Sequence, residues 1–307
     1  MLTLNKFEEA SEKVKEVTLE TKLIYSEFLS NQSGNKVFLK PENLQLTGAY
    51  KVRGAYYKID TTGDVELDNG LFATLYDNVG GDNYYDEITV TSGRDTDTDY
   101  YVATIPLNDS DGNLIVPYVN DETSNPTRGT LKYAQDEFTT LTVNAGLGYQ
   151  DSHGIWQQGT VISNGVITHV YEGDTELNPE RCSYIGFKAD RTVKNYLCTT
   201  TGEAMLADGV KDAYLTFGQV VVNGTNVLDE ETWGEAAGYH PLVYIGVKAD
   251  GTMVILASDG RTNHDRGLTC YAGANKMIAL GCLNVWRTDG GGSSSLVWKG
   301  SKQTRNM

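Results

Sequence analysis

Three segments near the C-terminus decide the fold that we expect: Met253-Val-Ile-Leu-Ala-Ser258, Thr269 to Gly281, and Leu283-Asn-Val-Trp-Arg287. The first and third are apolar runs of strand length, and the second has a helical pattern with Thr269 as N-cap and Gly281 as its stop. A strand–helix–strand unit is a crossover, and crossovers connect parallel strands. The loops after the two strands should therefore lie at one edge of the sheet, where sites form in such units.

Both loops carry residues suited to catalysis. Asp259-Gly-Arg261 follows the first strand, and Asp289 with Gly290, Gly291 and Gly292 follows the second. On neighbouring strands the two aspartates would lie about 5–8 Å apart. Two carboxylates can supply a nucleophile or base and an acid for glycosyl transfer. Arg261 can bind a phosphate, and successive glycine N–H groups can form an anion-binding nest.

Each of these residues also has an ordinary structural explanation. The aspartates could simply cap turns, and Gly290–Ser295 could be a flexible linker, although apolar strands flank it closely. His264 in the first loop is a candidate proton carrier, or only a solvated loop histidine. We predict Asp259, Asp289 and His264 as catalytic residues.

The bulk composition limits the classes of function. The 307 residues carry a net charge of −16, with a pI near 4.6, which disfavours a nucleic-acid binder because phosphate backbones would be repelled. No apolar run approaches membrane-spanning length, and the charged start predicts no signal peptide. We expect a protein without membrane contact, either cytoplasmic or carried on a phage particle.

The chain between residue 61 and the C-terminal unit reads as strands and turns. Glu87–Thr91 and Asp99–Ile105 are β-type runs, and Asp109–Asn113 fits a hairpin turn better than a calcium loop. Two segments echo each other, Tyr184–Asp190 and Tyr244–Asp250, and suggest a repeated hairpin inside one sheet. The expected fold class is α+β: a β-rich mixed sheet with a terminal strand–helix–strand crossover, preceded by a short, mostly helical N-terminal segment.

The first 60 residues differ in composition from the rest. They hold nine Lys or Arg against eight Asp or Glu, whereas the remainder holds 16 against 33. Apolar spacing predicts helices over Phe7–Val17 and around Leu19–Leu29, then a strand at Lys36–Lys40. We therefore divide the chain into domains 1–60 and 61–307.

Residues 1–59 resemble the start of the threonine dehydratase family, which depends on pyridoxal phosphate. The likeness rests on Leu39-Lys-Pro-Glu-Asn-Leu-Gln-Leu-Thr-Gly-Ala-Tyr-Lys51-Val-Arg-Gly-Ala55. It implies that Lys51 matches the lysine that forms the Schiff base. A cofactor site also needs a phosphate cradle, and no such glycine-rich loop with a βα pattern follows Asp60. We expect no pyridoxal phosphate and a fragment without that function.

Residues of about 85–301 resemble the phosphodiester glycosidase family. The matching segments are Thr142-Val-Asn-Ala-Gly146, Gln158–Gly165, Ser258–Arg261, Gly267-Leu-Thr269 and Asp289–Ser294. The resemblance implies a pocket lined by Asn144, Asp259, Arg261, Asp289 and Ser293. It also places Gly146 and Thr269 among the substrate-binding residues.

Two departures from the family pattern bear on this pocket. The family's His-Pro-Arg-Thr appears as His240-Pro-Leu-Val243, and its Asn-Leu-Asp appears as Arg287-Thr-Asp289. We expect a hydrolase that cleaves a sugar-phosphodiester or related glycosidic bond, with a carbohydrate or sugar-phosphate substrate and no metal or cofactor. The alternative is a non-catalytic carbohydrate-binding or structural module of a phage particle.

The four cysteines show no metal-ligand spacing. We interpret them as small buried hydrophobic residues, with a Cys270–Cys282 disulfide as the alternative.

Overall fold

The computed structural model describes Ser11, Lys15 and residues 22–41, 71–75, 84–121, 129–151, 154–170, 181–228 and 238–305. The chain divides into two compact units, Met1–Glu66 and Leu67–Met307. Lys51 and the predicted helix at Phe7–Val17, apart from Ser11 and Lys15, lie outside the described residues. None of the helices in the described ranges has the length and hydropathy needed to cross a membrane.

The described part of the first unit is a small β-α-β element. Strands β1 (Ile24–Tyr25) and β2 (Phe38–Leu39) pair antiparallel on either side of helix α2 (Glu27–Ser33). The Ser26 hydroxyl accepts a hydrogen bond from the Leu29 N–H and caps α2. The helix predicted around Leu19–Leu29 is therefore misplaced: it begins only after Ser26, because the N-cap fixes its start.

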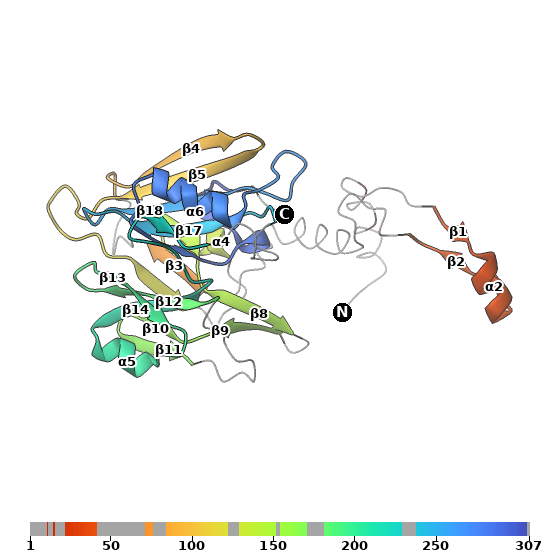
Figure 1. Cartoon of the computed structure of the whole chain (residues 1–307), viewed down its shortest axis with the longest axis horizontal. Coiled ribbons are helices and arrows are strands. Elements are labelled where there is room, and N and C mark those ends of the chain that lie inside the picture. The colour runs from red at the N-terminus through yellow and green to blue at the C-terminus, as the bar shows by residue number, and fades with distance from the viewer. Residues whose placement is uncertain are drawn as a thin grey trace. The chain divides into compact units, whose positions relative to one another are not determined.

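The second unit is built mainly from three antiparallel sheets (Figure 1). The seven-stranded sheet has the order β16-β15-β19-β17-β18-β5-β4: β4 (Thr89–Asp95), β5 (Thr98–Ile105), β15 (Gln219–Val222), β16 (Thr225–Asn226), β17 (Val243–Val247), β18 (Met253–Ser258) and β19 (Asn284–Arg287). The first five-stranded sheet has the order β11-β10-β14-β12-β13: β10 (Val161–Ser163), β11 (Val166–His169), β12 (Ser183–Lys188), β13 (Val193–Leu197) and β14 (Val210–Thr216). The second has the order β21-β20-β7-β3-β6: β3 (Leu71–Leu75), β6 (Tyr118–Asp121), β7 (Leu141–Asn144), β20 (Leu296–Trp298) and β21 (Ser301–Lys302).

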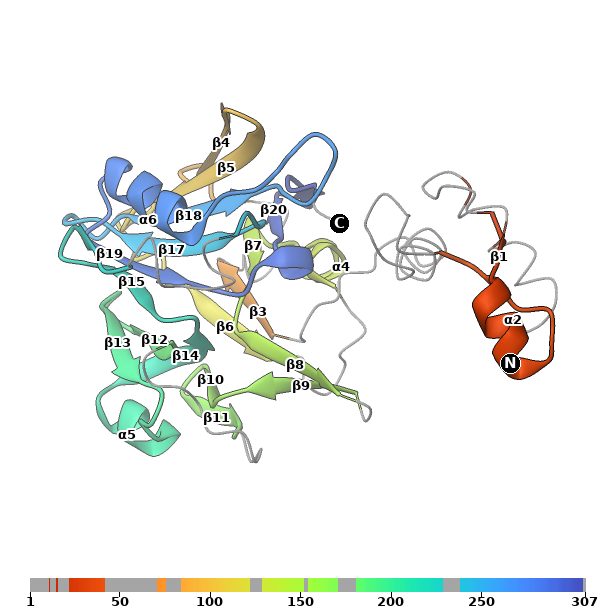
Figure 2. The same cartoon turned by 45° about the vertical axis from the view of Figure 1, so that its right-hand side comes forward.

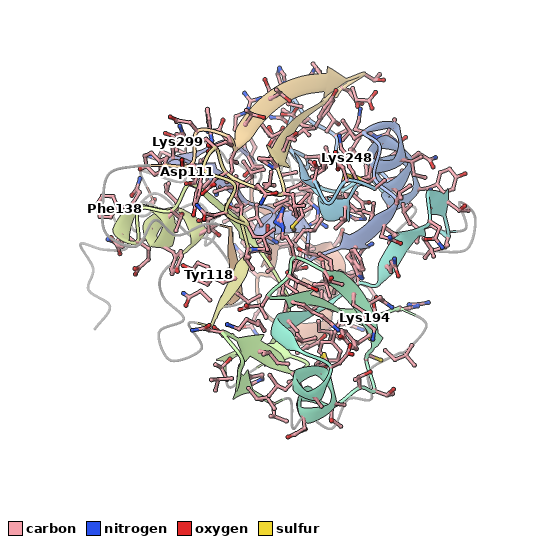
Figure 3. The ribbon with its side chains drawn as sticks, turned by 90° about the vertical axis from the view of Figure 1, so that its left-hand side faces the viewer. Asp111, Tyr118, Phe138, Lys194, Lys248 and Lys299 are labelled. Atoms are coloured by element: carbon pink, nitrogen blue, oxygen red, sulfur yellow. The ribbon has the colours of Figure 1, made fainter. Side chains whose placement is uncertain are left out.

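Three α-helices and a ribbon complete the described part of this unit. Helices α4 (Thr130–Asp136), α5 (Gly202–Ala207) and α6 (Cys270–Ala279) lie outside the sheets, and β8 (Leu147–Asp151) pairs with β9 (Gly154–Gln158). In Figure 2, the β8–β9 ribbon extends away from the other strands, and α5 lies beside β10 and β11. Figure 3 places Lys194 on β13 and Lys248 near α6.

The main core lies where the three sheets meet. It contains Ile255 from β18, Phe187 from β12 and Val143 from β7. The next residues along β18, Val254 and Leu256, pack instead under α6. Because both faces of β18 are covered, its sequence is continuously apolar rather than alternating.

Helix α6 lies close against β17. A Cβ atom added to Gly273 would come 2.5 Å from the Tyr244 ring, so only glycine fits at this contact. Thr269 caps α6, as predicted, by accepting a hydrogen bond from the Ala272 N–H. The helix separates Cys270 from Cys282 by more than ten residues, about 15 Å of helix, which is too far for a disulfide. None of the four cysteines forms a disulfide, and all four are buried.

The prediction that β18 and β19 are parallel neighbours is wrong in one respect. β17 pairs antiparallel with both β18 and β19, so β18 and β19 run in the same direction but are not neighbours. Every hydrogen-bonded strand pair in the described ranges is antiparallel, so the sheet is not mixed. The reason is the tight hairpin between β17 and β18, which inserts β17 between the strands that α6 connects.

The two similar hairpins, which were predicted to lie in one sheet, belong to different sheets. β12 and β13 pair in a five-stranded sheet, whereas β17 and β18 pair in the seven-stranded sheet. Phe187 and Ile245 from these hairpins meet in the main core. The Asp109–Asn113 turn is confirmed, because the Asp109 carboxylate accepts hydrogen bonds from the N–H groups of Asp111 and Asn113.

Candidate active site

A cavity of about 220 Å³ opens at one edge of the seven-stranded sheet. β18 and β19 both end at this edge and the antiparallel β17 begins there, so three chain segments converge. The residues that line the cavity are Phe217, His240, Leu242, Arg261, Arg287, Asp289, Gly290, Gly291 and Gly292. The structure thus brings together Arg261, Asp289 and the three glycines of the predicted site.

Arg261 lies over the glycine-rich loop. A Cβ atom on Gly291 would come 2.9 Å from Arg261 Nη1, and Gly291 has a φ of +66°, so the guanidinium can approach because residue 291 is glycine. Arg261 Nη2 also lies 2.9 Å from His240 Nδ1. Since a guanidinium only donates, His240 Nδ1 accepts this hydrogen bond, and the neutral ring carries its proton on Nε2.

Asp289 begins the loop. Its Oδ1 accepts a hydrogen bond of 2.8 Å from the Gly290 N–H, and its backbone oxygen accepts one of 3.0 Å from Asn144 Nδ2. The Gly291 N–H donates to the Pro241 oxygen at 2.9 Å. Two of the three glycine N–H groups are therefore already used within the protein, so the predicted anion nest is not formed. The positive charge at this cavity comes from arginine side chains.

Four other predicted residues do not line the cavity in the part of the chain that the structure describes. Asn144 is buried and hydrogen bonded to the loop, and Ser293 closes the 3-10 turn Gly291–Ser293. Gly146 takes a φ of +71° between β7 and β8, and the Thr269 hydroxyl caps α6.

Asp259 is the main correction to the predicted site. Its side chain is fully buried and accepts hydrogen bonds from the backbone N–H and Nε of Arg305 and from the Tyr101 hydroxyl. Burial raises the pKa of Asp259 above its ordinary value, against the opposing effect of the Arg305 hydrogen bonds. Asp289 lines the cavity and Asp259 does not, within the described ranges. The two aspartates therefore do not pair there, because β17 separates the strands that precede them.

His264 also does not line the cavity in the described part of the chain. Its side chain is exposed, 3.1 Å from Arg94 Nη1 and 3.4 Å from Asp265 Oδ2. Ligand atoms of Asp99, His264 and Asp265 lie within 4.8 Å of one another, a spacing that a metal ion could use. Arg94 pairs with both carboxylates, however, and Arg305 also pairs with Asp99, so both carboxylates already have cationic partners and we assign no metal site.

Sequence reasoning did not assign His240, Arg287 and Phe217 to the site. His240 and Arg287 lie in the two segments that depart from the family pattern. These departures were the sequence signal that could have assigned both residues to the site. Phe217, which follows β14, enters the cavity wall only through the tertiary structure, and its sequence context gave no indication.

Comparisons with known proteins agree with this architecture. The catalytic domain of zebrafish N-acetylglucosamine-1-phosphodiester alpha-N-acetylglucosaminidase superposes with a TM-score of 0.54 at 15% identity, covering 76% of this chain and 80% of that one. A prophage-derived protein of Bacillus subtilis, YomE, is 27% identical over 173 residues, which is 55% of this chain and 26% of that protein.

The N-terminal resemblance is confirmed as a partial one. The L-threonine ammonia-lyase of Thermotoga maritima is 44% identical over 73 residues, or 24% of this chain and 18% of the enzyme. The chain thus spans about a quarter or less of the length of either curated relative.

From the sequence we expected the family likeness over residues of about 85–301. The model of the phosphodiester glycosidase family matches residues 137–307. This match covers more than half of the chain, and the chain therefore belongs to the phosphodiester glycosidase family.

Proposed function

We propose that the protein hydrolyses the glycosidic bond of a sugar-phosphodiester in the cavity around Asp289. The observation that carries this proposal is that a carboxylate, Asp289, and a guanidinium, Arg261, line the same cavity of about 220 Å³. This volume is below the roughly 300–1,000 Å³ of sites for drug-sized ligands. It suits a phosphate and part of one sugar.

In the proposed reaction a water molecule attacks the anomeric carbon of the sugar. The bond from this carbon to the phosphate oxygen breaks, and its electron pair leaves with the phosphate monoester. Asp289 accepts the proton of the attacking water. Arg261 stabilises the charge that develops on the leaving phosphate, which is the larger requirement because phosphate is a weakly basic leaving group.

His240 and the glycine-rich loop hold this arrangement in place. His240 accepts the hydrogen bond that orients Arg261, and Gly291 leaves room for the guanidinium. Asp259 acts in this proposal as a buried anchor of the segment before Arg261, through Arg305 and Tyr101, rather than as a second catalytic carboxylate.

Turnover of a sugar-1-phosphodiester by the full chain tests the proposal, with release of the reducing sugar as the measurement. We expect Asp289→Asn to lower kcat by about 100-fold or more, since loss of a general base removes about 10²–10⁴ in rate. The matched control is Asp111→Asn, in an exposed turn. Equal turnover by the wild type and Asp289→Asn would refute the role of Asp289.

A second candidate is a non-catalytic carbohydrate-binding module of a phage particle, favoured by the similarity to a prophage-derived protein. Specific glycan binding by the wild type, with no turnover of any sugar-phosphodiester, would support this candidate over hydrolysis.

We also propose that Lys51 carries no pyridoxal phosphate. The similarity to the threonine ammonia-lyase covers only 18% of that enzyme, too little to supply a phosphate cradle and a partner for the pyridine nitrogen. Appearance of a Schiff-base absorbance band on adding pyridoxal phosphate, lost in Lys51→Ala, would refute this.

A further inference from the structure

Arg287 is a second guanidinium in the cavity wall, and nothing in the proposed reaction yet uses it. It is the last residue of β19, is partly buried, and lines the cavity together with Arg261 and Asp289. Its position follows from β19 ending at the same edge of the sheet as β18.

Two neighbours hold the Arg287 side chain. The guanidinium carbon lies 4.2 Å from the centre of the Phe217 ring, a cation–π contact. Nη1 donates a hydrogen bond of 2.7 Å to Cys270 Sγ. Neither neighbour is an anion, so neither neutralises the charge of Arg287.

The described residues provide no charged partner for this cation. Arg287 forms no ion pair with any carboxylate of the described ranges, and its Nε is buried without a hydrogen-bond acceptor among them. A partly buried guanidinium without an anion carries a desolvation cost that a bound anion relieves. The arrangement is that of a site prepared for a ligand.

The charges of the cavity fit a monoanion. The lining holds two guanidinium groups, from Arg261 and Arg287, and one carboxyl group, from Asp289, so cationic groups outnumber acidic ones by one. A phosphodiester carries one negative charge. We infer that Arg287 binds the phosphate of the substrate together with Arg261, and that Cys270 is the positioning residue that orients Arg287.

This inference rests on the proposed function only for the identity of the substrate, because the anion site itself can be tested without turnover. Inorganic phosphate serves as the probe, titrated into the full chain by calorimetry. We expect Arg287→Gln to weaken phosphate binding by about 10- to 100-fold, as expected for loss of a charge-assisted hydrogen-bonding partner. Arg287→Lys should restore part of the affinity, because it retains the charge but not the planar fork.

Arg266→Gln is the matched control. Arg266 also stacks on an aromatic ring, 3.6 Å from the centre of Tyr239, and it is exposed. It does not line this cavity in the described chain. Its replacement should leave phosphate affinity unchanged within about twofold. Thermal unfolding of each variant checks that the fold is retained.

Cys270 is tested by two substitutions. Cys270→Ser keeps an acceptor for Arg287 Nη1 and should keep phosphate affinity within about threefold, whereas Cys270→Val removes the acceptor and should weaken it by about tenfold. Equal affinities of the serine and valine variants, both folded, would overturn the positioning role.

The outcomes separate this inference from the proposed function. Phosphate binding that depends on Arg287, in a protein without turnover, supports the anion site and counts against hydrolysis. Turnover that depends on Asp289, with phosphate affinity and KM unchanged in Arg287→Gln, overturns the inference and leaves hydrolysis standing. Failure of the wild type to bind phosphate at millimolar concentration also overturns it.

Discussion

Asn144 holds Asp289 in place through the main chain. Asn144 Nδ2 donates to the Asp289 backbone oxygen at 3.0 Å, and Asn144 Oδ1 accepts from the Ser295 N–H at 2.8 Å. One buried amide at the end of β7 therefore fixes both ends of the glycine-rich loop. The loop that lines the cavity thus depends on a strand about 145 residues earlier in the chain.

Replacing Asn144 should affect stability and the site together. Asn144→Ala removes the hydrogen bonds that the Asn144 amide makes to the Asp289 oxygen and from the Ser295 N–H, and the loss of one buried hydrogen-bonding partner costs about 1–3 kcal/mol. We expect the free energy of unfolding to fall by about 2–4 kcal/mol for the pair. Urea denaturation measures this. An unchanged midpoint and slope would contradict the assigned role of Asn144.

Two adjacent glycines provide a matched pair of substitutions. In Gly291→Ala the new methyl group would lie 2.9 Å from Arg261 Nη1, and the φ of +66° would be strained. In Gly292→Ala the methyl group would meet nothing within 4 Å. We expect a loss of phosphate affinity of about tenfold in the first variant, and less than twofold in the second, as displacement of one charge-assisted contact predicts. Calorimetric titration of both variants compares them, and equal affinities would count against the contact.

The two histidines should behave differently in turnover. His240 accepts the hydrogen bond that orients Arg261, whereas His264 is exposed beside Arg94 and Asp265. We expect His240→Ala to lower kcat/KM by about tenfold or more, because it loses a hydrogen bond to a charged group. His240→Asn should recover part of it by offering an oxygen near the place of Nδ1.

His264→Ala is the control for His240 and should change kcat/KM by less than about twofold, an ordinary result for an exposed residue. A loss in His264→Ala as large as that in His240→Ala would instead return His264 to the catalytic role predicted from the sequence.

Asp259 should contribute less to stability as the pH rises, which is the opposite of the usual effect of an aspartate. Burial raises the pKa of Asp259 in the folded protein, so the folded state binds the proton more tightly than the unfolded chain. This contribution to stability is complete below the unfolded pKa of about 3.9 and is lost as the pH rises through the higher folded pKa. The stability of the wild type relative to Asp259→Asn should therefore fall as the pH rises through this range.

Asp190→Asn is the control, because the contribution of Asp190 to stability should depend on pH in the opposite direction. The Thr192 N–H donates to the Asp190 carboxylate and lowers the pKa of Asp190. Its contribution to stability is present above the unfolded pKa and is lost as the pH falls. Urea denaturation between about pH 3 and pH 7 measures both slopes. A rise with pH in the Asp259 comparison would contradict the raised pKa.

Local features were predictable from the sequence. The continuous apolar run Met253–Ser258 is strand β18, because a strand covered on both faces has no polar positions. Thr269 caps α6 because a threonine oxygen before a helix satisfies an otherwise unpaired N–H group. The family likeness also rested on local segments, among them Ser258–Arg261 and Asp289–Ser294, which follow β18 and β19.

Relationships between distant segments were not predictable in the same way. The alternating and apolar patterns of β17, β18 and β19 do not specify their order, and the insertion of β17 separates Asp259 from the cavity that Asp289 lines. The partners of the buried Asp259, namely Tyr101 and Arg305, lie 158 and 46 residues away in the chain.

The sequence by itself determined the β-rich architecture, the helix start at Thr269, and the arginine and glycines near Asp289, because these depend on backbone preferences and on burial along a single segment. Only the tertiary structure decided that Arg287, His240 and Phe217 complete the cavity and that Asp259 does not. The physical reason is that strand order and side-chain contacts arise from packing between segments, and no local pattern of residues encodes which segment will become the neighbour of another.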